Sequence, residues 1–440
     1  MLNYSHSKPR VHRIYAMAAS KPSRELPSKR WTSFDGWNYN GMKERLQTAL
    51  AKIDKSALIH HAQSIKGQGL TMSEPFSAGQ YWICFEMVAQ DKSIVIARVR
   101  LPRHPDIPAT VSEEDVAYSI GCEAAAMEFV RMRLNAVSLP CVYACEGMGS
   151  QQAAVVGAPY VLIEGFYGNT LQDVEFDICD LLISTQEHII AQWTAVQAEL
   201  ATLAYPQIGT ICSVSETGDP IIGKLAAGEL MKLGPFSRAV DYFTALGNAA
   251  ANNTTTRLGA FVFLDIVETT DLFGRSVIKE FFPLNHMDLG TQNILVDEHF
   301  NFVAIIDWEF AQTAPWQVIH YPMPFPLLSP TEDILRDPNH IAYSNVCRQD
   351  AAQKIYVQKF RDVERELEGK GRQLGGSFAT NLDSPASRIY ACFMNIGRLP
   401  AADEDLIHEM ARLAFGLNPQ EVEEYVREVE RRHCLSTGAT

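Results

Sequence analysis

Residues 286–297 read HMDLGTQNILVD and residues 305–309 read IIDWE, and together they decide the fold of this 440-residue chain. Asn293 and Asp307 each lie seven residues from Phe300, in the middle of the intervening turn. A β-hairpin with its apex at this turn would bring the Asn293 amide and the Asp307 carboxylate side by side at its open end. The spacing therefore predicts that these two polar side chains belong to one site.

Asp288 lies in the loop that leads into the first strand of this hairpin. Two carboxylates and an amide oxygen form the oxygen-rich ligand set that Mg²⁺ prefers, alongside waters and substrate phosphates. We expect Asn293 and Asp307 to be the metal ligands, which leaves Asp288 free to orient and deprotonate an attacking hydroxyl group. Kinases divide these roles in the same way. The alternative, in which Asp307 only serves a turn of a surface hairpin, explains one aspartate but not the full set.

The motif in residues 286–309, His-x-Asp-x-x-x-x-Asn followed by apolar residues and Ile-Asp-Trp-Glu, resembles the aminoglycoside phosphotransferases and choline kinases. A weaker resemblance extends over about residues 70–320. It implies an α+β, protein-kinase-like fold of two lobes, with a small β-rich N-lobe and a larger helical C-lobe. It also implies ATP and Mg²⁺ as cofactors. The catalytic candidates are then Asp288 and His286, of which His286 would mainly organise the loop by packing and hydrogen bonding.

The N-terminal half offers a cation for the nucleotide phosphates. A strand predicted over residues 93–101 alternates so that Arg98 and Arg100 share one face, and Glu123 lies in the apolar stripe of a helix predicted over residues 114–134. A carboxylate on a core-facing stripe is costly unless it is paired. Arg98 is the first candidate partner and Arg100 the second, while a Glu123 turned towards solvent is the alternative. Protein kinases carry lysine at the strand position of Arg98. The arginine in this sequence instead resembles fungal-type phosphotransferases and choline kinases.

Two further segments resemble the nucleotide site of the same families. Ser77 and Gly79 lie between the first two predicted strands, where small residues would let backbone N–H groups approach phosphate. Residues 160–168 resemble the hinge between the lobes, in which the backbone groups of Glu164 and Phe166 would hold adenine. Neither segment is specific by itself, since a glycine in a turn is common and residues 160–168 also fit a plain buried strand.

The hydropathy pattern divides the chain into four parts. We expect a basic, disordered tail or targeting segment over 1–35, a helical extension over 36–66, the N-lobe over 67–165, and the C-lobe with the acceptor site over 166–440. Strands are predicted at 81–88, 93–101, 142–146, 160–164, 294–296 and 302–306, and helices at 43–61, 114–134, 188–204, within 235–270 and twice after 403.

The charge is uneven along the chain. The net charge is −14, from 38 basic and 52 acidic residues, yet residues 1–31 hold seven basic residues and one acidic residue. An acidic body argues against nucleic acid as a partner and favours a neutral or cationic acceptor. The longest apolar stretches are too short to cross a bilayer, so no integral membrane contact is expected. The scattered cysteines indicate reduced thiols of an intracellular protein, placed in the cytoplasm or, if the basic tail is a presequence, in mitochondria.

These features predict an ATP- and Mg²⁺-dependent phosphotransferase that acts on a hydroxyl group of a small molecule, possibly an amine-bearing one, as a monomer or homodimer. Trp308 is expected in the core, whereas Glu309 would face an amino group of the acceptor. One alternative is an inactive kinase-fold protein that binds nucleotide or acts as a scaffold. A protein kinase is disfavoured because Asp307 is followed by Trp-Glu rather than Phe-Gly, and no Ala-Pro-Glu segment follows.

Overall fold

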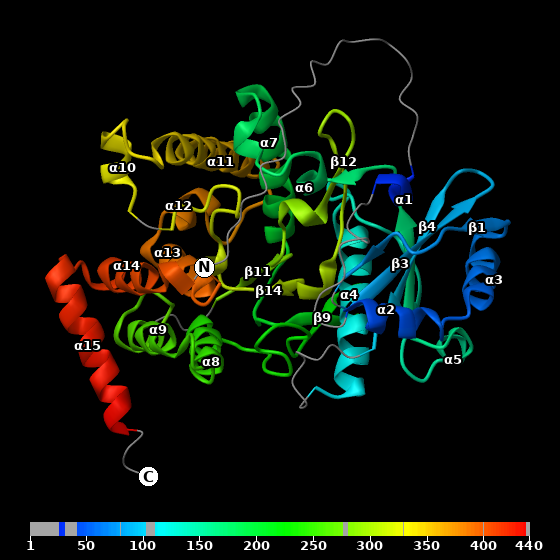
Figure 1. The fold of residues 1–440 in the computed structure, drawn as a ribbon, viewed down its shortest axis with the longest axis horizontal. Helices are drawn as coiled ribbons and strands as arrows, with labels where there is room; N and C mark the ends of the chain where they lie inside the picture. Colours follow the sequence, from blue (N-terminus) through cyan, green and yellow to red (C-terminus); the bar gives the residue numbers. More distant parts are fainter. Residues whose placement is uncertain are drawn as a thin grey trace.

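The computed structural model describes residues 26–30, 42–79, 81–102, 111–275, 280–328, 330–398 and 400–436. Most of the predicted basic tail therefore lies outside the described residues. The described chain forms an N-terminal sheet with its helices and a larger, mainly helical C-terminal part (Figure 1). The predicted α+β fold class, with a small β-rich N-lobe and a larger helical C-lobe, is confirmed. Among the described residues, no helix combines the length and the apolar character that a membrane span requires.

The N-lobe is built on one antiparallel sheet. Its strands are β1 (Leu70–Met72), β2 (Ser77–Ala78), β3 (Trp82–Ala89), β4 (Ile94–Arg100), β5 (Val142–Glu146) and β6 (Tyr160–Gly165). They lie in the order β1-β3-β4-β6-β5, and β2 pairs with β3. The strands read as almost continuous apolar runs because both faces of this sheet are covered by helices.

One face of the sheet packs against α2 (Met42–Leu50) and α3 (Lys55–Lys66). The sequence predicted a single helix over residues 43–61, which was wrong. Asp54 ends that pattern, because its carboxylate accepts a hydrogen bond from the backbone of Ala57 and caps the N-terminus of α3. The short helices of this lobe are α1 (Pro27–Arg30) and α5 (Gln151–Val156).

The other face of the sheet carries α4 (Glu113–Arg133), which lies between the sheet and the C-lobe in Figure 1. A capping box begins this helix, since Ser112 and Asp115 each bond the other's backbone. Glu123 lies in the middle of α4, so the helix carries this carboxylate to the junction between the two lobes.

The C-lobe is mainly helical, and two large apolar clusters fill it. Its helices are α6 (Leu171–Val174), α7 (Ile183–Ala201), α8 (Ala239–Ala251), α9 (Arg257–Thr269), α10 (Glu332–Arg336), α11 (Tyr343–Gly369), α12 (Phe378–Leu382), α13 (Pro385–Asn395), α14 (Asp403–Phe415) and α15 (Pro419–Ser436). Its short strands are β7 (Asn169–Thr170), β8 (Ala204–Tyr205), β9 (Thr210–Val214), β10 (Pro220–Gly223), β11 (Phe282–Asn285), β12 (Ile294–Val296), β13 (Phe302–Ile305) and β14 (Gln312–Thr313). The hairpin β12–β13 extends through β7, which follows the inter-lobe hinge.

Candidate active site

The β12–β13 hairpin sets the register of the site. Ile294 pairs with Ile305, and the backbone N–H of Ile306 donates to the carbonyl of Asn293 at 2.9 Å. The predicted symmetric pairing of Asn293 with Asp307 is therefore off by one residue. The turn closes between Asp297 and Asn301, one residue earlier than predicted, and the extra residue Val303 in a bulge of β13 shifts the register back by one. Asp307 follows Ile306 in the left-handed region, with φ of 64°. The sharp turn at Asp307 aims its carboxylate away from the strand and towards the N-lobe.

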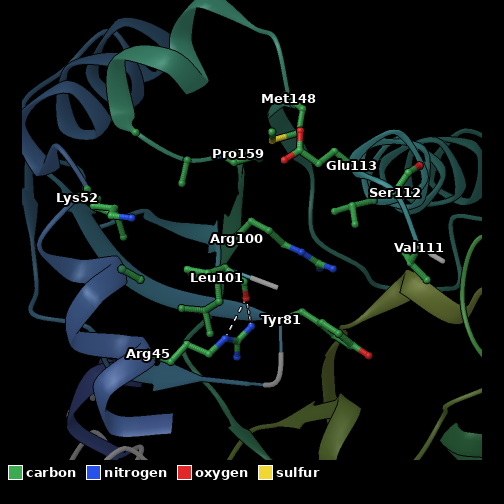
Figure 2. Close-up of a pocket in the computed structure, with 16 residues that line it drawn as sticks. Arg45, Lys52, Tyr81, Arg100, Leu101, Val111, Ser112, Glu113, Met148 and Pro159 are labelled. Atoms are coloured by element: carbon green, nitrogen blue, oxygen red, sulfur yellow. Dashed lines mark hydrogen bonds between the residues drawn. The ribbon is translucent and has the colours of Figure 1, made fainter. Parts of the chain in front are cut away.

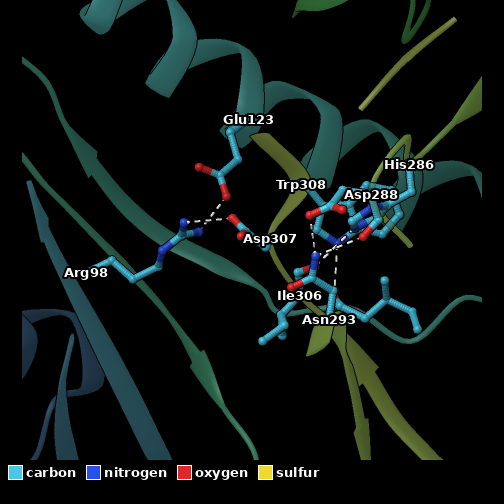
Figure 3. Close-up of polar contacts among 9 residues, drawn as sticks. Arg98, Glu123, His286, Asp288, Asn293, Ile306, Asp307 and Trp308 are labelled. Atoms are coloured by element: carbon cyan, nitrogen blue, oxygen red, sulfur yellow. Dashed lines mark hydrogen bonds and ion pairs between the residues drawn. The ribbon is translucent and has the colours of Figure 1, made fainter. Parts of the chain in front are cut away.

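The loop before β12 holds the Asp288 carboxylate beside Asn293 (Figure 3). The Asn293 side-chain Nδ2 donates to the Asp288 carbonyl at 2.8 Å and to the Asp288 Oδ2 at 2.9 Å, and Gln292 Nε2 donates to Oδ1 at 3.3 Å. Burial raises the pKa of Asp288, the nearby Asp307 raises it further, and the bonds from Asn293 and Gln292 oppose the shift. A positioned carboxylate with a raised pKa suits proton acceptance from a hydroxyl group.

His286 is buried behind this loop. Its Nε2 donates to the carbonyl of Ile306 at 3.0 Å, and its ring meets Trp308 edge to face at 4.7 Å between centroids. Burial lowers the pKa of His286 to about 4, so the ring is neutral at physiological pH. The contacts of His286 join the catalytic loop to the hairpin, which makes it a positioning residue. Trp308 is buried as predicted, and its indole N–H donates to the Ile305 carbonyl at 2.9 Å.

Arg98 joins the two lobes. Its Nη1 lies 2.5 Å from Glu123 Oε1 on α4, and its Nη2 lies 3.1 Å from Asp307 Oδ1 (Figure 3). Burial disfavours the guanidinium charge, but the carboxylates of Glu123 and Asp307 raise the Arg98 pKa overall. Burial raises the pKa of Glu123, and the Arg98 charge opposes that shift. Of the two arginines considered from sequence, the structure places Arg98 against Glu123, and Glu123 does not face solvent.

The donor set at the hairpin fits a hard divalent cation. Both Asn293 amide hydrogens point to Asp288 acceptors, and no described group bonds Asn293 Oδ1, while Asp307 uses Oδ1 towards Arg98. Among the described residues, no group of three or more His, Cys, Asp or Glu side chains could hold a metal. A site that depends on one carboxylate, one amide oxygen and phosphate oxygens matches the way Mg²⁺ is usually held at nucleotides.

The phosphate-loop candidates begin at β2, which lies on the other side of β3 from Arg98. Ser77 pairs across the sheet with Cys84, which pairs in turn with Arg98, so the three residues form one row. The backbone N–H of Gly79 donates to the Trp82 carbonyl at 2.8 Å. That N–H is therefore engaged within the hairpin, and phosphate contacts would have to come from other groups of the loop.

The hinge candidates follow β6. The Glu164 carboxylate accepts a hydrogen bond from the backbone of Cys141 at 3.1 Å, so its side chain braces the sheet. In the described part of the chain, no group bonds the backbone of Phe166, which leaves it available to an adenine edge. A side chain at Gly165 would collide with Ile94, so only glycine allows β4 and β6 to approach here.

The sequence reasoning missed two contributors, Gln292 and Arg398. Gln292 lies four residues after Asp288, and this spacing could have identified it. The exposed Arg398 follows α13 and acts to lower the pKa of Asp288, and no pattern in the sequence around Arg398 indicates this effect. Glu309 was expected to face the acceptor. Burial raises the Glu309 pKa to about 8, Asp307 adds to the rise, and the charges of Arg98 and Arg100 oppose it. Glu309 therefore lies within electrostatic reach of the arginines of β4.

No family model and no curated protein matches the chain. Among solved structures, it is similar to a Thermobifida fusca protein assigned as a fructosamine-3-kinase, with 13% identity, a TM-score of 0.42, and coverage of 83% of this chain and 100% of that chain. An amicoumacin kinase in complex with AMP-PNP and Ca²⁺ gives 11% identity, a TM-score of 0.42, and coverage of 88% and 96%.

A macrolide 2'-phosphotransferase from Brachybacterium faecium gives 15% identity, a TM-score of 0.37, and coverage of 85% of this chain and 97% of that chain. These likenesses are too distant to assign an activity. The function has to follow from the residues of this chain.

Proposed function

We propose that this protein is an ATP- and Mg²⁺-dependent phosphotransferase that phosphorylates a hydroxyl group of a small molecule. We further infer that it is a fungal-type member of the aminoglycoside phosphotransferase and choline kinase-like family. The observation that carries the proposal is the convergence of Asp288, Asn293 and Asp307 from one loop and hairpin, with Arg98 reaching Asp307 from the other lobe.

Each residue has a separate part in this reaction. Asn293 and Asp307 would hold Mg²⁺, whose charge would offset that of the β- and γ-phosphates. Arg98, held by Glu123, would bind the α- and β-phosphates. Asp288 would orient the acceptor hydroxyl and take its proton as the oxygen attacks the γ-phosphorus, while the bond to the ADP oxygen breaks.

The charges around Asp288 bear on the acceptor. The carboxylates of Asp288 and Asp307 lie close enough for each to affect the other, and the exposed Arg398 supplies one positive charge at this side. A neutral or amine-bearing alcohol would approach this surface more readily than an anionic one. Within the cell, we place the protein in the cytoplasm, with mitochondrial import as the alternative if the basic tail acts as a presequence.

The proposal is tested by measuring ADP release from Mg-ATP with a panel of amino alcohols, aminoglycosides, sugars and nucleosides. We expect at least one hydroxyl compound to be phosphorylated. Asp288→Asn should lower kcat by about 10² or more, because general base catalysis typically contributes 10²- to 10⁴-fold. The same variant should still bind Mg-AMP-PNP. The matched control is Glu298→Gln, an exposed change in the turn of the same hairpin, which should leave both readouts unchanged.

Two results would contradict the proposal. If Mg-AMP-PNP binds and binding requires Asp307, but no acceptor in the panel is phosphorylated, the chain is an inactive nucleotide-binding member of the fold. The single glycine of its phosphate loop and the engaged N–H of Gly79 favour this second candidate. If no nucleotide binds to the full chain, the site assignment itself is wrong.

A further inference from the structure

A second cavity lies in the N-lobe, at the end of the sheet where β4 stops. Its volume is about 570 Å³, within the range of small-molecule sites. Figure 2 shows its walls, which come from α2, the end of β4, the start of α4 and the segment before β6. None of the residues assigned above to Mg²⁺, to adenine or to the catalytic loop lines it.

Arg100 projects into this cavity (Figure 2). Its guanidinium carbon lies over the faces of two aromatic rings, 4.7 Å from the ring centroid of Tyr81 and 4.9 Å from that of Trp82. Among the described residues, no carboxylate or carbonyl accepts a hydrogen bond from its side chain. Aromatic rings attract the cation but accept no conventional hydrogen bond, so the N–H groups of Arg100 can still bind a bidentate acceptor.

The lack of a partner matters because Arg100 is largely withdrawn from water. Burial lowers the pKa of Arg100, and Glu309 and Tyr81 only partly oppose that effect. Arg98, two residues earlier on the same face, has two carboxylate partners at 2.5 and 3.1 Å. A buried cation gains most from an anion that can bond both of its edge nitrogens.

The remaining lining defines what kind of anion would fit. Lys52 projects into the cavity from the end of α2, and within the described chain its ammonium group has no acceptor. Arg45 adds a third positive charge, although it already donates to the Pro102 carbonyl, and Glu113 is the one carboxylate among the lining residues. The remaining surface is largely apolar, with Ala49, Ile53, Leu101, Val116 and Met148 among the residues that form it.

We propose that this cavity binds a small molecule with a phosphate or carboxylate head and an apolar body, and that its binding is coupled to the nucleotide site through α4. The head would lie between Arg100 and Lys52, and the apolar body would cover the walls from α2 and α4. The cavity reaches both Glu113, in the first turn of α4, and Tyr81, beside the phosphate loop. Because α4 also carries Glu123, an occupant that shifts this helix would change the Arg98–Glu123 pair. The coupling rests on the proposed function, whereas the binding does not.

The test uses calorimetry on the full chain with phenyl phosphate, benzoate, inorganic phosphate and benzyl alcohol as probes. We expect one of the two aryl anions, or both, to bind at one site and more tightly than inorganic phosphate, and benzyl alcohol not to bind. Arg100→Gln should weaken the aryl anion at least tenfold, and Lys52→Gln severalfold. The matched control is Lys224→Gln, an exposed lysine outside the cavity lining, which should leave the affinity unchanged.

A second variant keeps the test valid if Arg100→Gln fails to fold. Ala158 lines the cavity and is only partly buried, so Ala158→Phe should fill the space and abolish binding of the probe. The site is overturned if neither aryl anion binds, if both variants bind the probe like the wild type, or if saturating Mg-AMP-PNP displaces the probe. For the coupling, we expect the AMP-PNP affinity to change at least threefold with the probe bound, and equal affinities would overturn it. A chain that binds the probe but no nucleotide would contradict the proposed function and leave the site standing.

Discussion

Removal of the Glu123 carboxylate tests the ion pair on which the candidate nucleotide site depends. Glu123 is 5% exposed and Arg98 8%, and their charged atoms lie 2.5 Å apart. Breaking a buried pair by removing one partner costs about 3–5 kcal/mol of stability, because the other charge is left uncompensated. Here Asp307 remains as a second partner, but its side chain is 36% exposed, so its contact offsets only about 1 kcal/mol. We expect Glu123→Ala to lower the free energy of unfolding by about 2–4 kcal/mol.

Urea unfolding followed by circular dichroism would measure this loss. The matched control is Glu128→Ala, which removes an exposed carboxylate from the same helix and should change stability by less than about 0.5 kcal/mol. The double variant Arg98→Met/Glu123→Leu should recover most of the stability, because apolar side chains can replace a buried pair at little cost. It should nevertheless fail to bind Mg-AMP-PNP.

Two results would refute this reasoning. A loss below about 1 kcal/mol for Glu123→Ala would show that the carboxylate is not needed to hold the buried guanidinium. A double variant that retains full AMP-PNP affinity would show that Arg98 contributes to stability but not to the phosphate site. Recovered stability together with lost nucleotide affinity separates the two roles of the pair.

Three further predictions concern the same region. Because burial lowers the pKa of His286 from 6.5 to about 4, the unfolded chain takes up the proton first, and stability falls as the pH drops from 6.5 to 4, by about 3 kcal/mol from this group. His286→Gln should reduce the fall of the free energy of unfolding between pH 6.5 and pH 4, as measured by urea unfolding. The control His188→Gln, at an exposed site, should leave this pH dependence unchanged. The same pH dependence in wild type and His286→Gln would show that His286 does not cause the fall. Asp307→Asn should remove the Mg²⁺ dependence of AMP-PNP binding in calorimetry, and a retained dependence would exclude Asp307 as a ligand. Gly165→Val should lower the free energy of unfolding by about 1–3 kcal/mol through its collision with Ile94, measured as a lower urea midpoint. An unchanged midpoint would show that the strands can separate.

The local pattern of apolar and polar residues predicts most of the strands and helices of the N-lobe. The strands predicted at 93–101 and 142–146 lie at Ile94–Arg100 and Val142–Glu146. The first is a run rich in β-branched residues, and the second is a short segment that begins with Val and Tyr, both common in strands. The same pattern gave a wrong prediction at Asp54. This residue caps the N-terminus of α3, so the one helix expected there is two helices. The pattern gave no prediction for α11, a 27-residue helix with a mainly polar sequence and buried residues such as Tyr356 and Phe360.

Only those site residues could be predicted that residue spacing or family resemblance indicates. The loop and hairpin place Asp288 and Asn293 five residues apart, so their contact follows from local geometry. The contact of Arg98 with Asp307 spans 209 residues and depends on how the two lobes pack. The effect of the exposed Arg398 on Asp288, and the lack of a described acceptor for the Arg100 side chain, could not be found from sequence, because each depends on which groups a distant element brings nearby.

The local charge gives a physical reason to expect a divalent cation, independent of any family resemblance. Four carboxylates, those of Glu123, Asp288, Asp307 and Glu309, act on one another around the two guanidinium groups of Arg98 and Arg100. Burial raises the Glu309 pKa to about 8, so at neutral pH this carboxylate is mostly protonated, and the other three carboxylates balance the cations of Arg98, Arg100 and Arg398. Nucleotide phosphates would add several negative charges that these cations do not offset. A divalent cation held by Asp307 would supply positive charge against the phosphates, and Arg98, which now pairs with Asp307, would then be available to bind phosphate.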